Sequence, residues 1–276
     1  MKRQLAALLL TIFALSLTAC GETAAESETR TVYAMDTVMN LTVYGENAAA
    51  ALESAEKELH TLDEAVLSRT AEGSELYALN ASNGETVEYG ADDILPALIE
   101  TALTISDATD GAFDPTLAPV LDAWGFTKDE RRVPSADELK ELLSHTGCGK
   151  VALEKTADGW TVTLLDGAQL DLGGIAKGYA AGRVRTILRE AGVTSAIISL
   201  GGNVAAVGKK PDGSAWTVGL QDPDRPEAYF GTVSIEDACV VTSGAYQRYF
   251  EENGQLYHHI IDPATGRPAE SGLTSV

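Results

Sequence analysis

The stretch LDLGGIAKGYAAG, residues 170–182, opens the best-defined helix of the chain. From Ala176 onward, apolar residues recur at steps of three and four and form one stripe: Ala176, Ala180, Val184, Ile187, Leu188 and Ala191. Gly192 comes directly after this stripe and suits the end of a helix. The pattern predicts a helix that starts just after Asp171, ends near Gly192 and packs one face on a core.

The beginning of this helix carries residues suited to an anion. The first turn of a helix has free N–H groups and the positive end of the helix dipole. Asp171 precedes it, Gly173 and Gly174 allow a backbone to come close, and Lys177 adds a positive charge. The spacing of glycine, lysine and hydroxyl does not match a P-loop. The residues alone leave two interpretations open: a binding turn, or an ordinary strand-to-helix turn with a solvated lysine.

The remaining periodicity predicts an α+β fold. Helices are expected at 47–66 and 92–109, after Pro115, and from Ser135, where Ser135 and Glu138 resemble a capping box. Residues 67–90 are expected to be rich in loops. Strands are expected at 31–44, 150–154, 160–165, 195–200, 215–221, 229–235, 238–242 and 256–261. Early helices and clustered late strands favour mixed, largely antiparallel sheets with packed helices over a regular βαβ arrangement.

The N-terminus is typical of a secreted lipoprotein. Lys2 and Arg3 precede an apolar run that ends in Leu-Thr-Ala-Cys, which resembles a bacterial lipobox. We therefore expect a signal peptide at 1–19, lipidation at Cys20, a flexible tether at 20–30 and one domain at 31–276. The protein would be extracytoplasmic and anchored by lipid to a bacterial membrane. The alternative is an ordinary secretory signal with an incidental cysteine.

The charge of the chain excludes nucleic acid as a natural partner. It has 41 acidic and 20 basic residues, for a net charge of −21. Loss of residues 1–19 removes Lys2 and Arg3, so the mature charge is 18 minus 41, or −23. Nucleic acids need basic partners, and any phosphate ligand must bind against this overall field. Cys148 and Cys239 are expected to be free, with Cys239 buried.

Three further stretches have a functional and a structural interpretation. In DGAFDPTLAP, residues 110–119, Asp114 either caps a helix that starts at Pro115 or orients a flat ring. In SLGGNVAAVG, residues 199–208, the paired glycines mark a bulge or a close approach of ligand. In VTSGAYQRYF, residues 241–250, the hydroxyls line a site or belong to a turn.

The stretch YHHIIDPATGRP, residues 257–268, holds half of the four histidines of the chain. Adjacent residues of a strand point to opposite faces, so at most one histidine faces a given site. That histidine is a candidate general base, and a solvent-exposed pair is the alternative. No third ligand lies nearby at metal spacing, which argues against zinc.

Taken in order, these motifs resemble one family. The stretches AMDTVMNL (34–41), DGAFDPTLAPVLDAWGF, LDLGGIAKGYAAG, SLGGNV, TSGAYQRYF and HHIIDPATGRP are similar to those of FAD:protein FMN transferases of the ApbE type. The resemblance runs from about residue 31 to the end. It implies that FAD is cleaved at its pyrophosphate, that FMN is joined through phosphate to a threonine of a target protein, and that AMP leaves. It also implies Mg²⁺ and a target such as a subunit of a membrane redox pump.

The resemblance assigns roles by position. His259 would lie near the pyrophosphate, as the catalytic histidine, and the backbone carbonyl of Gly174 would ligate Mg²⁺. FAD would be contacted by Met35, Thr70, Ala112, Phe113, Asp114, Asp171, Lys177 and Ile261. Met35 would pack on the flavin, Thr70 falls near an aromatic flavin contact of the family, and Ile261 would line the adenine or ribose.

Two departures accompany these assignments. The family's Met-Gly-Thr reads Met35-Asp36-Thr37, which puts an acid where glycine is usual. The chain stops at GLTSV, where a strand is expected to begin, so the resemblance places the other magnesium ligands beyond Val276. A chain that ended at Val276 is expected to have weak or absent transfer activity. An Mg²⁺-dependent FAD pyrophosphatase and a flavin-binding lipoprotein without catalysis are the alternatives. The lack of a two-lobed βαβ repeat disfavours a solute-binding lipoprotein.

Overall fold

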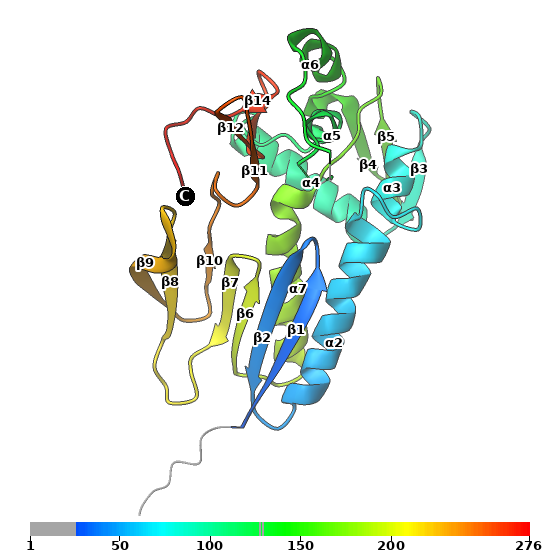
Figure 1. Ribbon diagram of the computed structural model, residues 1–276. Helices are drawn as coiled ribbons and strands as arrows, with labels where there is room; N and C mark the ends of the chain where they lie inside the picture. Colours follow the sequence, from blue (N-terminus) through cyan, green and yellow to red (C-terminus); the bar gives the residue numbers. More distant parts are fainter. Residues whose placement is uncertain (1–25, 127, 129) are drawn as a thin grey trace, which may run out of the picture.

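The computed structural model describes residues 26–126, 128 and 130–276 and is built on one five-stranded sheet (Figure 1). Its order is β1-β2-β6-β7-β10, and every neighbouring pair is antiparallel. The strands are β1 (Ser27–Ala34), β2 (Thr37–Tyr44), β6 (Ser195–Leu200), β7 (Asn203–Gly208) and β10 (Cys239–Val241). This arrangement confirms the predicted α+β class.

Two long helices cover one face of this sheet. Helices α2 (Ala48–His60) and α7 (Gly173–Glu190) lie side by side against the sheet and run roughly along its strands (Figure 1). Strand β2 alternates, so that Met39, Leu41 and Val43 are fully buried, and the apolar stripes of both helices meet them in one large core. The periodicities that predicted α2 and α7 are therefore those of their buried faces.

The other elements form smaller units around this layer. A three-stranded sheet of order β3-β5-β4 packs with α3 and α4, and three two-stranded ribbons complete the chain. Their bounds are α3 (Glu75–Asn80), β3 (Val87–Gly90), α4 (Ile94–Ala108), α5 (Ala118–Trp124), α6 (Ala136–Leu143), a 3₁₀ turn (Cys148–Lys150), β4 (Val151–Lys155), β5 (Gly159–Leu164), β8 (Trp216–Asp222), β9 (Arg225–Ile235), β11 (Tyr249–Glu252), β12 (Gln255–His258), β13 (Ile261–Asp262) and β14 (Arg267–Pro268).

An aromatic cluster holds the β11–β12 ribbon against α5. Trp124 packs on Phe126, Phe250 and Tyr257 with ring centroids 5.4–6.2 Å apart. Its indole N–H donates to the carbonyl of Gly266 over 2.7 Å. A buried indole that packs and also satisfies its donor is firmly placed, so this cluster fixes where the histidine pair at the end of β12 lies.

Several expectations about local structure were wrong. Residues 31–44 form two strands and a turn at Met35 and Asp36, and β1 begins at Ser27, inside the predicted tether. Residues 27–30 are strand because β2 pairs with them, and their polar side chains find partners, as in the hydroxyl pair of Thr29 and Thr42 at 3.0 Å. Cys239 is exposed on the edge strand β10.

Three more segments differ from the prediction. The helix expected at 47–66 is α-helical to His60 and then continues as a π-helix over Thr61–Leu67. The loop-rich segment contains α3 and β3. The paired glycines at 201–202 are the two-residue turn between β6 and β7, and not a bulge. That turn allows β7, which the prediction lacked, to pair with β6.

Gly201 in this turn is required for both its conformation and its space. Its φ is +58°, and an added Cβ would lie 2.3 Å from Thr37 Oγ1, 2.7 Å from Cγ2 and 2.9 Å from Cβ. Rotation about χ1 of Thr37 cannot relieve all three contacts. Gly201→Ala should therefore lower the free energy of unfolding by about 2–4 kcal/mol, measured by denaturant unfolding. Gly213→Ala is the matched control, because its φ is +82° but no atom lies within 4 Å. Equal losses in both variants would contradict the steric argument.

Two N-terminal predictions lie outside the described residues: the signal peptide at 1–19 and the lipidated Cys20. Within the described part of the chain, none of the helices is both long enough and apolar enough to span a bilayer.

Candidate active site at the start of helix α7

Asp171 ties three segments together at the beginning of α7. Its Oδ1 accepts the N–H of Gly173 over 2.7 Å, and its Oδ2 lies 2.8 Å from Nε of Arg69. Its own N–H donates to the carbonyl of Pro115 over 2.7 Å. Both carboxylate oxygens are thus engaged, and the side chain joins the helix start to the segments around residues 69 and 115.

Gly174 gives the neighbouring segment a close approach. An added Cβ on Gly174 would lie 2.8 Å from Cε2 of Phe113, so the ring packs directly on the glycine backbone. Asp114 accepts from the N–H of Thr116 over 2.8 Å and also from its hydroxyl. The helix-cap interpretation of Asp114 was wrong: α5 begins at Ala118, and the carboxylate is used in a turn within the loop.

The β1–β2 turn presents an unusual backbone to the same region. Met35 and Asp36 have φ values of +52° and +56°, the combination of a two-residue type I′ turn. Aspartate tolerates this conformation, but methionine rarely adopts it. Met35 is half-buried against the main core. Strain of this kind is typical of functional sites.

His259 has one ring nitrogen fixed and one left for chemistry. Its ring Nδ1 lies 3.1 Å from the backbone carbonyl oxygen of Arg248, and the backbone N–H of His259 donates to the same oxygen. A carbonyl oxygen only accepts, so Nδ1 carries the hydrogen and Nε2 holds the free lone pair. Burial lowers the pKa of His259; the hydrogen bond to the Arg248 carbonyl opposes this shift, and the positive charge of Arg248 adds to it. The ring is therefore prepared as a neutral base.

Two cations accompany His259. Burial, and then the Arg248 guanidinium, lower the pKa of Lys177, whereas Asp171 and Asp36 raise it. Lys177 in turn lowers the pKa of His259. The Arg248 guanidinium donates to the carbonyl of Asp36 over 3.3 Å. These groups come from α7, the β1–β2 turn and the two positions that flank the β11–β12 ribbon, and together they form a basic cluster in an acidic protein.

The structure brings most of the predicted residues together. Met35, Phe113, Asp171, Gly174, Lys177 and His259 belong to segments that contact one another as described. Ala112 and Thr70 are exposed beside Phe113 and Arg69. Ile261 is 8% exposed in the aromatic cluster, so most of its surface is used in packing. The individual roles of these residues in FAD binding stay predictions.

Arg69 and Arg248 were missed by the sequence analysis. Arg69 also lies 3.2 Å from Asp122, which makes it a bridge between two carboxylates. Its sequence neighbourhood has no motif that marks it. Arg248 could have been found, because it lies among the aromatics of TSGAYQRYF.

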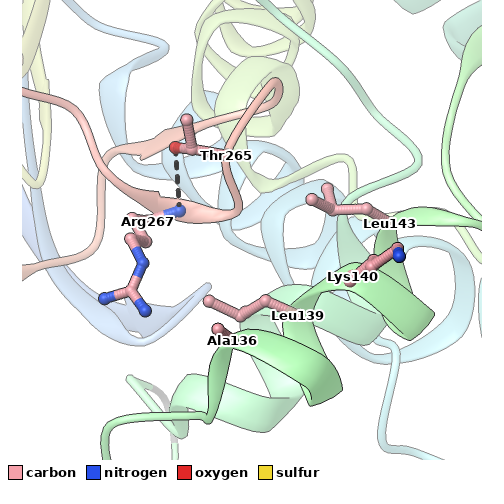
Figure 2. Close-up of a pocket in the computed structure, with 6 residues that line it drawn as sticks. All are labelled: Ala136, Leu139, Lys140, Leu143, Thr265 and Arg267. Carbon is pink, nitrogen blue, oxygen red and sulfur yellow. Dashed lines mark hydrogen bonds between the residues drawn. The ribbon is translucent and has the colours of Figure 1, made fainter.

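A separate pocket lies between α6 and the β13–β14 turn (Figure 2). It measures about 220 Å³ and is lined by Ala136, Leu139, Lys140, Leu143, Thr265 and Arg267. Sites for drug-sized ligands are usually about 300–1,000 Å³, so this one is too small for a dinucleotide. It contains none of the predicted site residues.

The metal prediction rests on Gly174 alone. Its carbonyl lies in the first turn of α7, where helical carbonyls accept from the residue four positions on. Among the described residues, no group of three or more His, Cys, Asp or Glu side chains could hold a metal ion. Mg²⁺ is usually held by one or two protein groups together with waters and substrate phosphates, so the Gly174 carbonyl would supply only part of its ligand set.

The fold and the site define an α+β protein with a cluster of positive charge beside the start of a helix. Comparison with known proteins specifies it further: residues 35–276 match the model of the ApbE family, and the chain belongs to that family. The predicted family is thereby confirmed.

The similarity to known proteins extends over most of their length. The chain is 38% identical to FAD:protein FMN transferase of Treponema pallidum over 93% of this chain and 75% of that protein. It is 29% identical to the Escherichia coli K12 protein of the same name, over 88% and 70%. The ApbE protein of Thermotoga maritima superposes with a TM-score of 0.84 at 34% identity, over 91% and 80%. Apo flavinyl transferase ApbE of Pseudomonas stutzeri gives 0.78 at 30%, over 93% and 80%. The prediction of an enzyme of this family agrees with these names.

Proposed function

We propose that this chain transfers FMN from FAD to a threonine hydroxyl of a target protein and releases AMP. The observation that carries the proposal is the convergence of His259, Lys177 and Arg248 beside the start of α7. Phosphoryl transfer is mostly positioning and charge stabilisation. A helix start and two cations supply the charge, and the free Nε2 of His259 supplies the base.

In the proposed reaction, the threonine of the target displaces AMP from FAD. The threonine oxygen attacks the phosphorus of the FMN half of FAD and forms a new P–O bond, while its proton passes to Nε2 of His259. The bond between this phosphorus and the bridging oxygen breaks, and AMP leaves with the electron pair. Lys177 and Arg248 offset the negative charge of the pyrophosphate. Asp171 holds the turn on which Gly173 and Gly174 meet the ligand.

One assay tests the proposal against its alternatives. The protein is incubated with FAD, Mg²⁺ and a threonine-bearing target, and AMP and covalent flavin are measured. AMP together with flavinylated target is the expected result. AMP with free FMN would identify a pyrophosphatase instead, with water in place of the threonine. Bound FAD without release of AMP would overturn both enzymatic functions.

We also propose that transfer depends on Mg²⁺, with the Gly174 carbonyl as one ligand. Removal of divalent cations by EDTA should abolish AMP release, and an excess of Mg²⁺ should restore it. Bound Mg²⁺ supplies neutralisation of developing phosphate charge. An undiminished rate in EDTA, measured by AMP formation, would show that the cations of the chain suffice.

For location, we propose a lipid anchor at Cys20 on the extracytoplasmic side of a bacterial membrane. The target would then be a membrane-associated protein such as a redox-pump subunit. Metabolic labelling with a fatty acid, compared between the unaltered chain and Cys20→Ser, tests this. Equal labelling would contradict it.

A further inference from the structure

Arg248 contacts two parts of the site, one through its backbone and the other through its side chain. Its backbone carbonyl accepts from Nδ1 of His259 over 3.1 Å. Its guanidinium reaches the β1–β2 turn, where Nη2 donates to the Asp36 carbonyl over 3.3 Å and Nη1 lies 3.9 Å from the Asp36 carboxylate. The residue that orients the base therefore also carries a positive charge beside it.

The ion pair between Arg248 and Asp36 is weakly held. Their closest charged atoms are 3.9 Å apart, and the side chains are 36% and 68% exposed. Exposed pairs at such a separation contribute little to stability. The guanidinium can donate shorter, paired hydrogen bonds to the oxygens of a diphosphate, which carry more negative charge than a carboxylate. The diphosphate would compete successfully with the Asp36 carboxylate for Arg248.

Asp36 acts on more than one cation of the cluster. Its negative charge is felt by Lys177 as well as by Arg248. It belongs to a turn that places it there by its backbone, with φ at +56°. Without a ligand, Asp36 therefore partly neutralises the charges that a phosphate would meet.

We propose that Arg248 is a second phosphate-binding cation of the site and that Asp36 is its counterion when no ligand is bound. The ligand chemistry is the diphosphate of a flavin dinucleotide, so this inference rests on the proposed function. When the ligand binds, the Arg248 side chain leaves Asp36 and contacts the diphosphate. Because the Asp36 carboxylate competes for Arg248, it limits how much the diphosphate adds to the affinity for the flavin. The pair thus determines discrimination between flavins with and without phosphate.

Equilibrium binding of FAD and riboflavin, followed by flavin fluorescence, tests this on the full chain. Arg248→Met keeps an unbranched apolar stem and removes the charge. It should weaken FAD binding about 10–100-fold, the effect of a lost charged hydrogen bond, and leave riboflavin binding within about twofold. Thermal unfolding of each variant controls for folding. Equal losses for FAD and riboflavin would show that Arg248 shapes the turn, and would overturn the proposal.

Asp36→Asn tests the counterion with the backbone conformation preserved, since asparagine also tolerates positive φ. It should strengthen FAD binding about two- to fivefold, the effect of a weak exposed pair. In the presence of Arg248→Met, Asp36→Asn should increase the FAD affinity by a smaller factor, because only Lys177 is then left to lose the opposing charge of Asp36. A full gain in the double variant, or no gain in Asp36→Asn, would overturn the proposal even if riboflavin binds too weakly to measure. If the unaltered chain binds neither flavin, the proposed function fails instead.

Discussion

His259→Gln should lower the rate of FMN transfer about 10²–10⁴-fold, the usual contribution of a general base. Glutamine keeps a polar side chain in the β11–β12 region but cannot take a proton from the threonine hydroxyl. FAD affinity should change little, because the ring is assigned to the hydroxyl and not to the flavin. Single-turnover formation of flavinylated target measures the rate, and fluorescence measures the affinity.

His258→Gln is the matched control for this substitution. His258 ends β12 opposite Tyr249, and His259 follows it with its ring held by Arg248. His258 belongs to β12, whereas His259 lies just beyond it, and only the His259 ring contacts the Arg248 carbonyl, so the control should retain most of the rate. Equal losses in the two variants would contradict the assignment of His259.

The pH dependence of the same reaction gives a second check. The base works only when neutral, so the rate falls as the pH drops through the pKa of His259. Burial and the Arg248 charge lower that pKa. The acid limb of the rate should therefore lie below about pH 6.5, the ordinary value for histidine. A limb above that value would indicate a different base.

The sequence predicted the long helices well because their signal is local, whereas the short helix α3 was missed. The stripes of α2 and α7 repeat over many residues, and each repeat reports the same buried face. The β1–β2 turn was missed because methionine rarely adopts a positive φ, so Met35 does not mark a turn even with Asp36 beside it. Strand β7 was missed because Gly201 and Gly202 also suit a bulge. Turns of two residues offer too few positions for a pattern to decide.

The site residues also fall into those that a local motif marks and those that only tertiary contacts reveal. Asp171, Lys177 and His259 stand in recognisable motifs, so the resemblance could assign them. Arg69 gained its importance from contacts with Asp171 and Asp122 that only the folded chain makes. The contact of Arg248 with Asp36 joins residues 212 positions apart. No periodicity or spacing encodes such a pair.

Asp171→Ala should abolish measurable FAD binding, a loss of roughly 100-fold or more. The carboxylate holds the Gly173 N–H and the Arg69 guanidinium, at 2.7 and 2.8 Å, and it is only 22% exposed. Removal of one partner of a largely buried charged pair costs about 3 kcal/mol or more, and here it also releases the glycine turn from Arg69. Titration of FAD fluorescence measures the loss. Unchanged affinity would refute the assignment.

Asp122→Ala is the control for Asp171→Ala. It removes a carboxylate partner of Arg69 without changing Asp171, so it shows whether the loss of FAD affinity comes from Asp171 itself or from a displaced Arg69. Asp122 is the second carboxylate that pairs with Arg69, at 3.2 Å, and its side chain is 38% exposed. Among the described residues, its ion pairs are with Arg69 and Lys128, and neither belongs to α7. Its removal leaves the Asp171–Arg69 pair intact, so FAD affinity should fall less than about threefold. Asp171→Asn, which retains an acceptor for the Gly173 N–H but no charge, should lie between the two. This order follows if Asp171 works through the turn and its charge together, whereas an equal loss in Asp122→Ala would place the effect on Arg69 alone.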